Sequence, residues 1–99
     1  MGSTAPAGGN VFDRLEKLIE FPVDFPFKVM GRPVDGFATT MGDVVMRHVP
    51  DFDPASITAR PSSQGNWLGL TLTVRVEHRA QLEALYADLT AHPMVRIIL

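Results

Sequence analysis

The polar run at residues 62–66 has the densest set of anion-binding groups in the chain, within the stretch "RPSSQGNWLGLTLTVRV". Its serine hydroxyls and backbone N–H groups are donors of the kind that hold a phosphate. A phosphate loop, however, leads into a helix whose dipole assists binding, whereas here Trp67 begins a strictly alternating, strand-like stretch. Glycine and asparagine also suit the positive φ angles of tight hairpin turns. The run therefore predicts a hairpin tip and leaves an anion contact at its serines open.

Residue types that usually carry catalysis or bind metals show no useful spacing. The absence of cysteine excludes thiolate zinc sites, iron–sulfur clusters and cysteine nucleophiles. His48, His78 and His92 are dispersed, with no i, i+4 pair and no carboxylate placed to complete a metal site. No pair of acidic residues is spaced for acid–base work. We therefore predict no catalytic residue, no metal and no cofactor.

Composition limits the chain to one small domain. Its 99 residues are 45% hydrophobic and 20% charged, which is typical of a globular protein. The formal net charge of −2 gives no general attraction to nucleic acid or to anionic membranes, so such binding would need a local patch. No apolar run approaches the roughly 20 residues of a membrane span, and residues 1–10 lack the pattern of a signal peptide. We expect a cytoplasmic protein with no membrane partner.

The N-terminal residues divide into two parts. Residues 1–10, "MGSTAPAGGN", are small and turn-forming and predict a disordered lead-in. Residues 11–99 predict a single domain that starts with a short amphipathic helix, capped by Asn10 and ended by Pro22. The apolar face of this helix would consist of Phe12, Leu15, Leu18 and Ile19.

Four later stretches alternate as half-buried strands do, at 24–31, 56–62, 67–77 and 94–99. Pro61 places the second stretch along a sheet edge or at a bulge. The side chains expected to face the core are Phe25, Phe27, Val29, Ile57, Ala59, Leu68, Leu70, Leu72, Val74, Val76, Val95, Ile97 and Leu99.

Two stretches have helical periodicity. Asp35 suits the N-cap of the first, which Pro50 stops, and Pro93 ends the second, which starts near Arg79. Strands and helices then follow the order βαββαβ, and right-handed crossovers put both helices on one face of the sheet. The sequence thus predicts an α+β, ferredoxin-like fold with a four-stranded antiparallel sheet. The helical core positions are Phe37, Met41, Val44, Val45, His48, Leu82, Leu85, Tyr86 and Leu89.

Three segments in this order, "LIEFPVDFPFKVMG", "RPSSQGNWLGLTLTV" and "QLEALYADLTAHPMVRIIL", resemble the motifs of the YbeD-like family of small bacterial proteins, a domain of unknown function. The likeness covers residues 12–99 and implies a ferredoxin-like fold similar to the ACT-type regulatory domains of amino-acid biosynthetic enzymes. The chain departs from the family at Val23, where relatives often carry cysteine, and at His78, where many have serine. Serine there would form a Ser-x-x-Gln capping box, so Gln81 is expected to lack its usual partner.

The sheet face opposite the helices is predicted to be polar and basic although the whole chain is acidic. Met30, Trp67 and Ile98 would add apolar anchors, and aromatic residues beside arginines are typical centres of protein interfaces. We therefore predict a non-enzymatic regulatory or scaffolding module. Its partner would be another protein, such as a metabolic enzyme, or a second copy in a homodimer. The predicted partner-binding residues are Lys28, Arg60, Trp67, Arg75 and Arg96.

Three other functions are weighed against this one. ACT-type domains bind small effectors near the loop after the first strand, which here contains Gly31, Arg32 and Gly36. RRM domains share the topology and bind single-stranded RNA, but they need several aromatic residues in mid-strand, and only Trp67 comes near. Acylphosphatases also share it and use an arginine loop with an asparagine, which Arg32 and Asn66 loosely resemble. Pro33 removes one N–H donor from that loop, which disfavours catalysis. The lack of aromatic residues in mid-strand disfavours nucleic acid.

Overall fold

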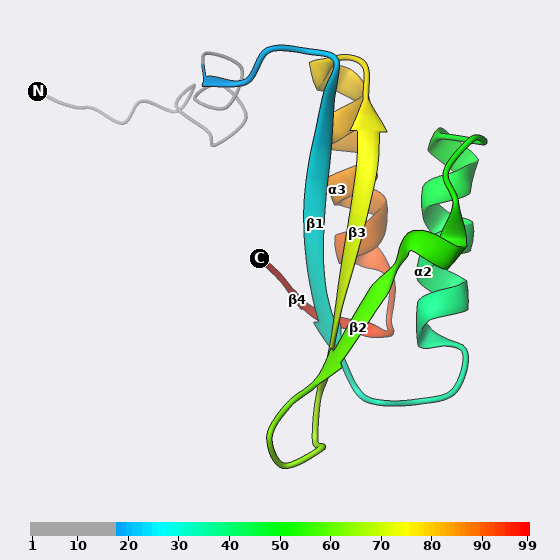
Figure 1. The fold of residues 1–99 in the computed structure, drawn as a ribbon, viewed down its shortest axis with the longest axis vertical. Helices are drawn as coiled ribbons and strands as arrows, with labels where there is room; N and C mark the ends of the chain where they lie inside the picture. Colours follow the sequence, from blue (N-terminus) through cyan, green and yellow to red (C-terminus); the bar gives the residue numbers. More distant parts are fainter. Residues whose placement is uncertain (1–17) are drawn as a thin grey trace, which may run out of the picture.

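The computed structural model describes residues 18–99. The predicted lead-in and all but the end of the predicted first helix lie outside this range. The remaining elements follow the expected order, which confirms the ferredoxin-like α+β fold (Figure 1). They are β1 (Val23–Gly31), α2 (Phe37–His48), a short 3-10 helix η1 (Pro54–Ser56), β2 (Thr58–Pro61), β3 (Leu68–Val76), α3 (Arg79–Ala91) and β4 (Val95–Ile98).

The sheet is antiparallel throughout, in the order β2-β3-β1-β4. Its centre is the pair β1 and β3, which are matched along their full length from Val23 opposite Val76 to Gly31 opposite Leu68. In Figure 1, α3 crosses behind these two strands and α2 lies beside it, while the hairpin between β2 and β3 extends beyond the helices. Among the described residues no helix covers the other side of the sheet, which we call the open face.

The core lies between this sheet and the two helices. Strand residues that alternate inward meet the apolar stripes of α2 and α3, as the periodicity predicts. Each fully buried side chain of this kind contributes about 1.5–3 kcal/mol relative to an exposed one. The buried residues are Phe27, Val29, Phe37, Met41, Val44, Val45, Phe52, Leu70, Leu72, Val74, Val76, Leu82, Leu85 and Leu89. Tyr86, expected among them, is exposed at the border of the α3 stripe.

The start of α2 differs from the prediction. Its N-cap is Gly36, with a φ of 82°, and no side chain caps the helix. The chain enters the helix through a left-handed residue, a conformation that glycine adopts without the steric cost of a Cβ atom. The cap therefore falls one position after Asp35.

The start of α3 also corrects an expectation. His78 is the N-cap, and its Nδ1 accepts a hydrogen bond from the Gln81 N–H (3.2 Å). Gln81 Oε1 in turn accepts from the Glu77 N–H (2.7 Å). The imidazole thus takes the place of the serine hydroxyl, and the arrangement resembles a capping box in which the returning bond reaches the N–H one residue before the N-cap. Gln81 has its partner after all.

Polar contacts also join the end of α2 to α3. The Gln81 side-chain amide donates to the carbonyl oxygen of His48 (3.4 Å), which is one of the last carbonyls of α2. His48 Nε2 lies 2.6 Å from Asp88 Oδ2. His48 follows the apolar stripe of α2 in the sequence, and its position also predicts a place at the helix end. It is the last residue of α2, and these contacts hold its side chain against α3.

β4 breaks its predicted alternation. Met30 is opposite Ile97 and Gly31 is opposite Val95, so Arg96 is an extra residue without a partner on β1. This bulge reverses the facing of the residues after it. Val95 and Ile98 pack against the core, whereas Ile97 and Leu99, both predicted inward, are exposed.

β2 is more exposed than its pattern predicts. Ala59 stands opposite Leu70, on the core side of the ladder, but no residue of β2 is buried. The strand lies at the edge of the sheet, where the helices do not cover it. The expectation that Ala59 is buried was therefore wrong, while the edge position inferred from Pro61 is confirmed.

None of the helices in residues 18–99 combines the length and apolar character that crossing a bilayer requires.

Candidate functional site

The hairpin between β2 and β3 is closed by Ser62 and Trp67. The Ser62 N–H donates to the Trp67 carbonyl oxygen (2.9 Å), and the Trp67 N–H donates to Ser62 Oγ (3.1 Å). Inside the turn, the Gly65 N–H donates to the Ser62 carbonyl oxygen (2.9 Å), and Gly65 has a φ of 75°. The prediction that the polar run is a hairpin tip is confirmed, and the Ser62 hydroxyl oxygen serves to close it.

Trp67 follows this tip, and two arginines from distant segments lie over its ring. The guanidinium carbon of Arg32, in the loop between β1 and α2, is 4.6 Å from the ring centroid. The guanidinium carbon of Arg96, the bulge residue of β4, is 5.8 Å from it. Both distances are within the range of cation–π attraction. We call Arg32, Trp67 and Arg96 the Trp67 cluster.

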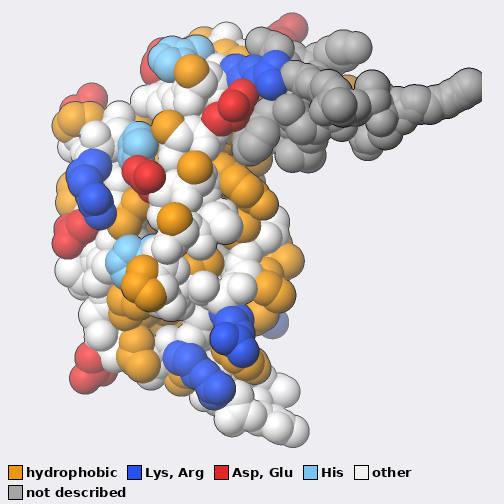
Figure 2. Space-filling model, turned by 180° about the vertical axis from the view of Figure 1, so that it is seen from behind, with side chains coloured by type: hydrophobic (Ala, Val, Ile, Leu, Met, Phe, Trp, Pro, Cys, Tyr) orange, Lys and Arg blue, Asp and Glu red, His pale blue; other side chains and the backbone are white. Residues whose placement is uncertain are grey.

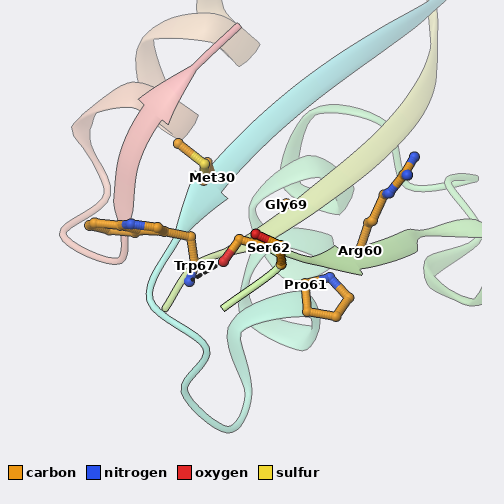
Figure 3. Close-up of a pocket in the computed structure, with 7 residues that line it drawn as sticks. Met30, Arg60, Pro61, Ser62, Trp67 and Gly69 are labelled. Carbon is orange, nitrogen blue, oxygen red and sulfur yellow. Dashed lines mark hydrogen bonds between the residues drawn. The ribbon is translucent and has the colours of Figure 1, made fainter. Parts of the chain in front are cut away.

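Next to the cluster, the open face is hollowed over Gly69. This hollow has a volume of about 400 Å³. Figure 3 shows Trp67 and Arg60 on opposite sides of Gly69, with Met30 at the third side and the Ser62–Trp67 hydrogen bond below. Because Gly69 has no side chain, it leaves an open floor between its neighbours. The lining residues are Met30, Arg60, Pro61, Ser62, Ser63, Trp67 and Gly69.

A second hollow, of about 200 Å³, adjoins the first and shares Met30, Arg60 and Gly69 with it. It continues along the open face past Lys28 and Thr71 to Leu99. Together, the two hollows form a shallow groove that has an apolar floor and basic side chains at its borders.

The basic side chains around this groove have no acidic partner within the described part of the chain. In residues 18–99, no carboxylate forms a salt bridge with Lys28, Arg32, Arg60 or Arg96. Seen from behind, Lys and Arg side chains gather at the lower end of the molecule, beside the projecting hairpin (Figure 2). Four unpaired cations on a chain with a net charge of −2 make this end a local basic patch.

Arg75, predicted to belong to the same surface, lies elsewhere. It stands opposite Asp24 near the far end of the β1–β3 ladder, and its Nη1 is 3.5 Å from Asp24 Oδ1. Both side chains are largely exposed. The structure therefore brings Lys28, Arg60, Trp67 and Arg96 together and leaves Arg75 apart from them.

The loop predicted to hold an effector has structural reasons for its glycines. A Cβ atom on Gly31 would clash with the Met94 carbonyl oxygen and come within 2.8 Å of the Phe37 ring. Gly36 supplies the left-handed start of α2. The Val34 and Phe37 N–H groups donate to carbonyl oxygens within the loop. Neither hollow is lined by Gly31, Arg32 or Gly36, and Arg32 belongs to the Trp67 cluster.

Some features of the site were not foreseen from the sequence. Ile97, and not Ile98, is the apolar residue of β4 on the open face, because the bulge reverses the alternation. The role of Gly69 was also missed. An isolated glycine inside a strand often marks a bulge or a place where a ligand or another backbone approaches closely. Gly69 in the sequence was therefore a clue to the position of the hollow.

Within the described part of the chain, three or more His, Cys, Asp or Glu side chains never come close enough together to hold a metal ion. The donors of the Trp67 cluster and of Arg60 are guanidinium N–H groups, which bind carboxylates and phosphates. The site can therefore bind an anionic group beside an apolar one.

Comparison with known proteins shows that the chain is similar to bacterial proteins of one family. A family model described as "Protein of unknown function (DUF493)" matches residues 16–99. A UPF0250 protein of Bordetella pertussis is 56% identical over 84 residues, which cover 85% of this chain and 92% of the relative. UPF0250 proteins of Ralstonia nicotianae and a Janthinobacterium species are 54% and 53% identical, over 85% and 88% of this chain and 87% and 96% of the relatives. None of these three names states an activity.

Proposed function

Since the chain belongs to the DUF493 (UPF0250) family of unknown function, as its YbeD-like motifs predict, we propose from the site alone that it is a non-enzymatic module that binds another protein through its open face. The observation that carries this proposal is the groove over Gly69, bordered by Trp67 and Arg60, with the Arg32 guanidinium over the Trp67 ring. Interface centres are rich in tryptophan and arginine and in methionine, and all three border this groove.

The arrangement favours protein over single-stranded RNA. Nucleic-acid sheets of this topology stack bases on exposed aromatic rings. Here the Arg32 guanidinium lies over the indole of Trp67, 4.6 Å from the ring centroid. The phenylalanines of β1, Phe25 and Phe27, lie on the core side of the sheet. A base that stacked on this face of the ring would have to compete with the arginine.

Site-specific photo-crosslinking tests the proposal. A benzoylphenylalanine at Thr71, which lines the groove, is expected to capture a protein in the producing bacterium. The same probe at Ala87, on the exposed side of α3, is the control. Mass spectrometry of the adduct separates a different protein from a second copy of this chain. Equal adducts from both positions, or none from Thr71, would contradict binding through the open face.

A further inference from the structure

From the chemistry of the groove we infer the kind of segment that it binds, and this inference rests on the proposed function. The segment is an extended, acidic stretch of a partner protein. Its carboxylates pair with the Trp67 cluster and with Arg60, and an aliphatic side chain enters the hollow over Gly69.

The guanidinium groups of the Trp67 cluster are positioned before any ligand arrives. Cation–π contact with an aromatic ring restrains a guanidinium and leaves N–H groups able to donate. Such a group binds a carboxylate through charge-assisted, often bidentate hydrogen bonds. Because Arg32 and Arg96 lack a carboxylate partner among residues 18–99, no internal ion pair has to break first.

The spacing of the cations indicates an extended segment. Arg60 and Trp67 lie on opposite sides of Gly69 (Figure 3), so a segment that crosses the hollow meets a cation on each side. The floor between them is apolar, with Met30, Pro61 and the indole among the lining groups. Alternating acidic and aliphatic side chains match this order. Charge complementarity of this kind also directs association with an acidic partner.

The single tryptophan of the chain provides the measurement. We expect a short blocked peptide of alternating glutamate and leucine to change Trp67 fluorescence in a saturable way. A peptide of alternating glutamine and leucine should bind at least about tenfold more weakly. A tenfold change in affinity corresponds to about 1.4 kcal/mol, which is less than the contribution of one charge-assisted hydrogen bond. Equal binding of the two peptides would overturn the inference.

Matched variants locate the binding site. Arg32→Gln/Arg96→Gln should weaken the glutamate–leucine peptide about tenfold or more. Arg47 is exposed in the last turn of α2 and lines neither hollow. Arg47→Gln/Arg75→Gln therefore removes the same charge away from the groove and should change binding less than about twofold. Isothermal titration calorimetry supplies a readout that does not depend on the environment of Trp67. Equal losses in the two double variants would show general charge attraction and overturn the site.

A hollow-filling variant tests the aliphatic contact independently of charge. A Cβ atom on Gly69 would meet only the Arg60 carbonyl oxygen, at an ordinary 3.5 Å, so Gly69→Leu fills the hollow from its floor. We expect it to reduce affinity for the glutamate–leucine peptide to that for a glutamate–alanine peptide, with unchanged circular dichroism. Retained preference for leucine would overturn this part.

The two proposals fail in different ways. An adduct at Thr71 combined with no binding of the acidic peptide overturns the inference and leaves the proposed function standing. No adduct at Thr71 overturns the proposed function and the inference with it. Tighter binding of an oligouridylate than of the acidic peptide, lost in Arg32→Gln/Arg96→Gln, would assign the groove to RNA and overturn both.

Discussion

Individual residues of this chain have roles that depend on contacts far away in sequence. Arg32 and Arg96 reach one ring from two ends of the chain. The Gln81 side chain accepts a hydrogen bond from the Glu77 N–H, before α3, and donates one to the His48 carbonyl oxygen, at the end of α2. The types of these residues were visible in the sequence. Their partners were not, because side-chain direction depends on the loop and bulge geometry around them.

The His78 cap gives a first prediction. Replacing an N-cap acceptor with alanine typically costs about 1 kcal/mol, so His78→Ala should lower the free energy of unfolding by about that amount, measured by urea denaturation. His78→Ser should remain close to the parent, since serine offers the hydroxyl acceptor of a standard capping box. If alanine and serine behave alike, the imidazole does not cap α3.

The two glycines of the sheet, Gly31 and Gly69, give a second prediction. Gly31→Ala forces a Cβ atom against backbone, and overpacking of this kind costs about 1–3 kcal/mol. Gly69→Ala, its control, meets only an ordinary contact and should change the free energy of unfolding by less than about 0.5 kcal/mol. Similar melting temperatures for the two variants would show that there is room for a Cβ atom between Gly31 and the Met94 carbonyl oxygen.

At the scale of whole elements, regular alternation was enough to predict β1 and β3, where most of one face is buried. It failed at β4, because a bulge adds a residue that periodicity alone cannot locate. It failed for Ala59 because an edge strand can point a side chain toward the core side without covering it. The site inherits these errors, since β2 lines the groove with Arg60 and Pro61 and β4 carries Arg96 over the Trp67 ring.

The bulge leads to a third prediction. Ile98 packs against the core, so Ile98→Ala should cost about 1–2 kcal/mol, near the low end for a large-to-small change because the residue is only partly buried. Ile97→Ala should cost less than about 0.5 kcal/mol, since Ile97 is 45% exposed. The reverse order in chemical denaturation would indicate unbroken alternation in β4.

At the scale of the whole molecule, the fold was predictable because topology, breakers and periodicity agreed. The uneven distribution of charge was predictable only in part. The sequence placed basic residues on one face of the sheet, and the structure gathers Lys28, Arg32, Arg60 and Arg96 at one end while Arg75 pairs with Asp24 at the other. Which charged side chains pair across neighbouring strands depends on the register of the strands, and the sequence alone does not determine that register.

This asymmetry gives a fourth prediction, at pH 7 on a sulfonate resin. Despite its net charge of −2, the protein should be retained at low salt through its basic end and be released as salt screens the patch, since the Debye length falls to about 10 Å at 0.1 M. Arg32→Gln/Arg96→Gln should elute at lower salt than Arg47→Gln/Arg75→Gln. Because the two variants have equal net charge, identical elution would mean that no local patch exists.

The bulge also bears on how the groove can change by mutation. Val95, Ile97 and Ile98 each have a partner on β1, and only Arg96 has none. Deleting the Arg96 codon would therefore leave a regular ladder with the same residues facing the core, and would remove one of the two cations over Trp67. A single in-frame deletion here can thus remove a surface cation without disturbing the ladder, whereas a codon lost elsewhere in β4 would shift a paired residue out of register. Length variation at this one position would therefore change the charge beside Trp67 while leaving the fold intact.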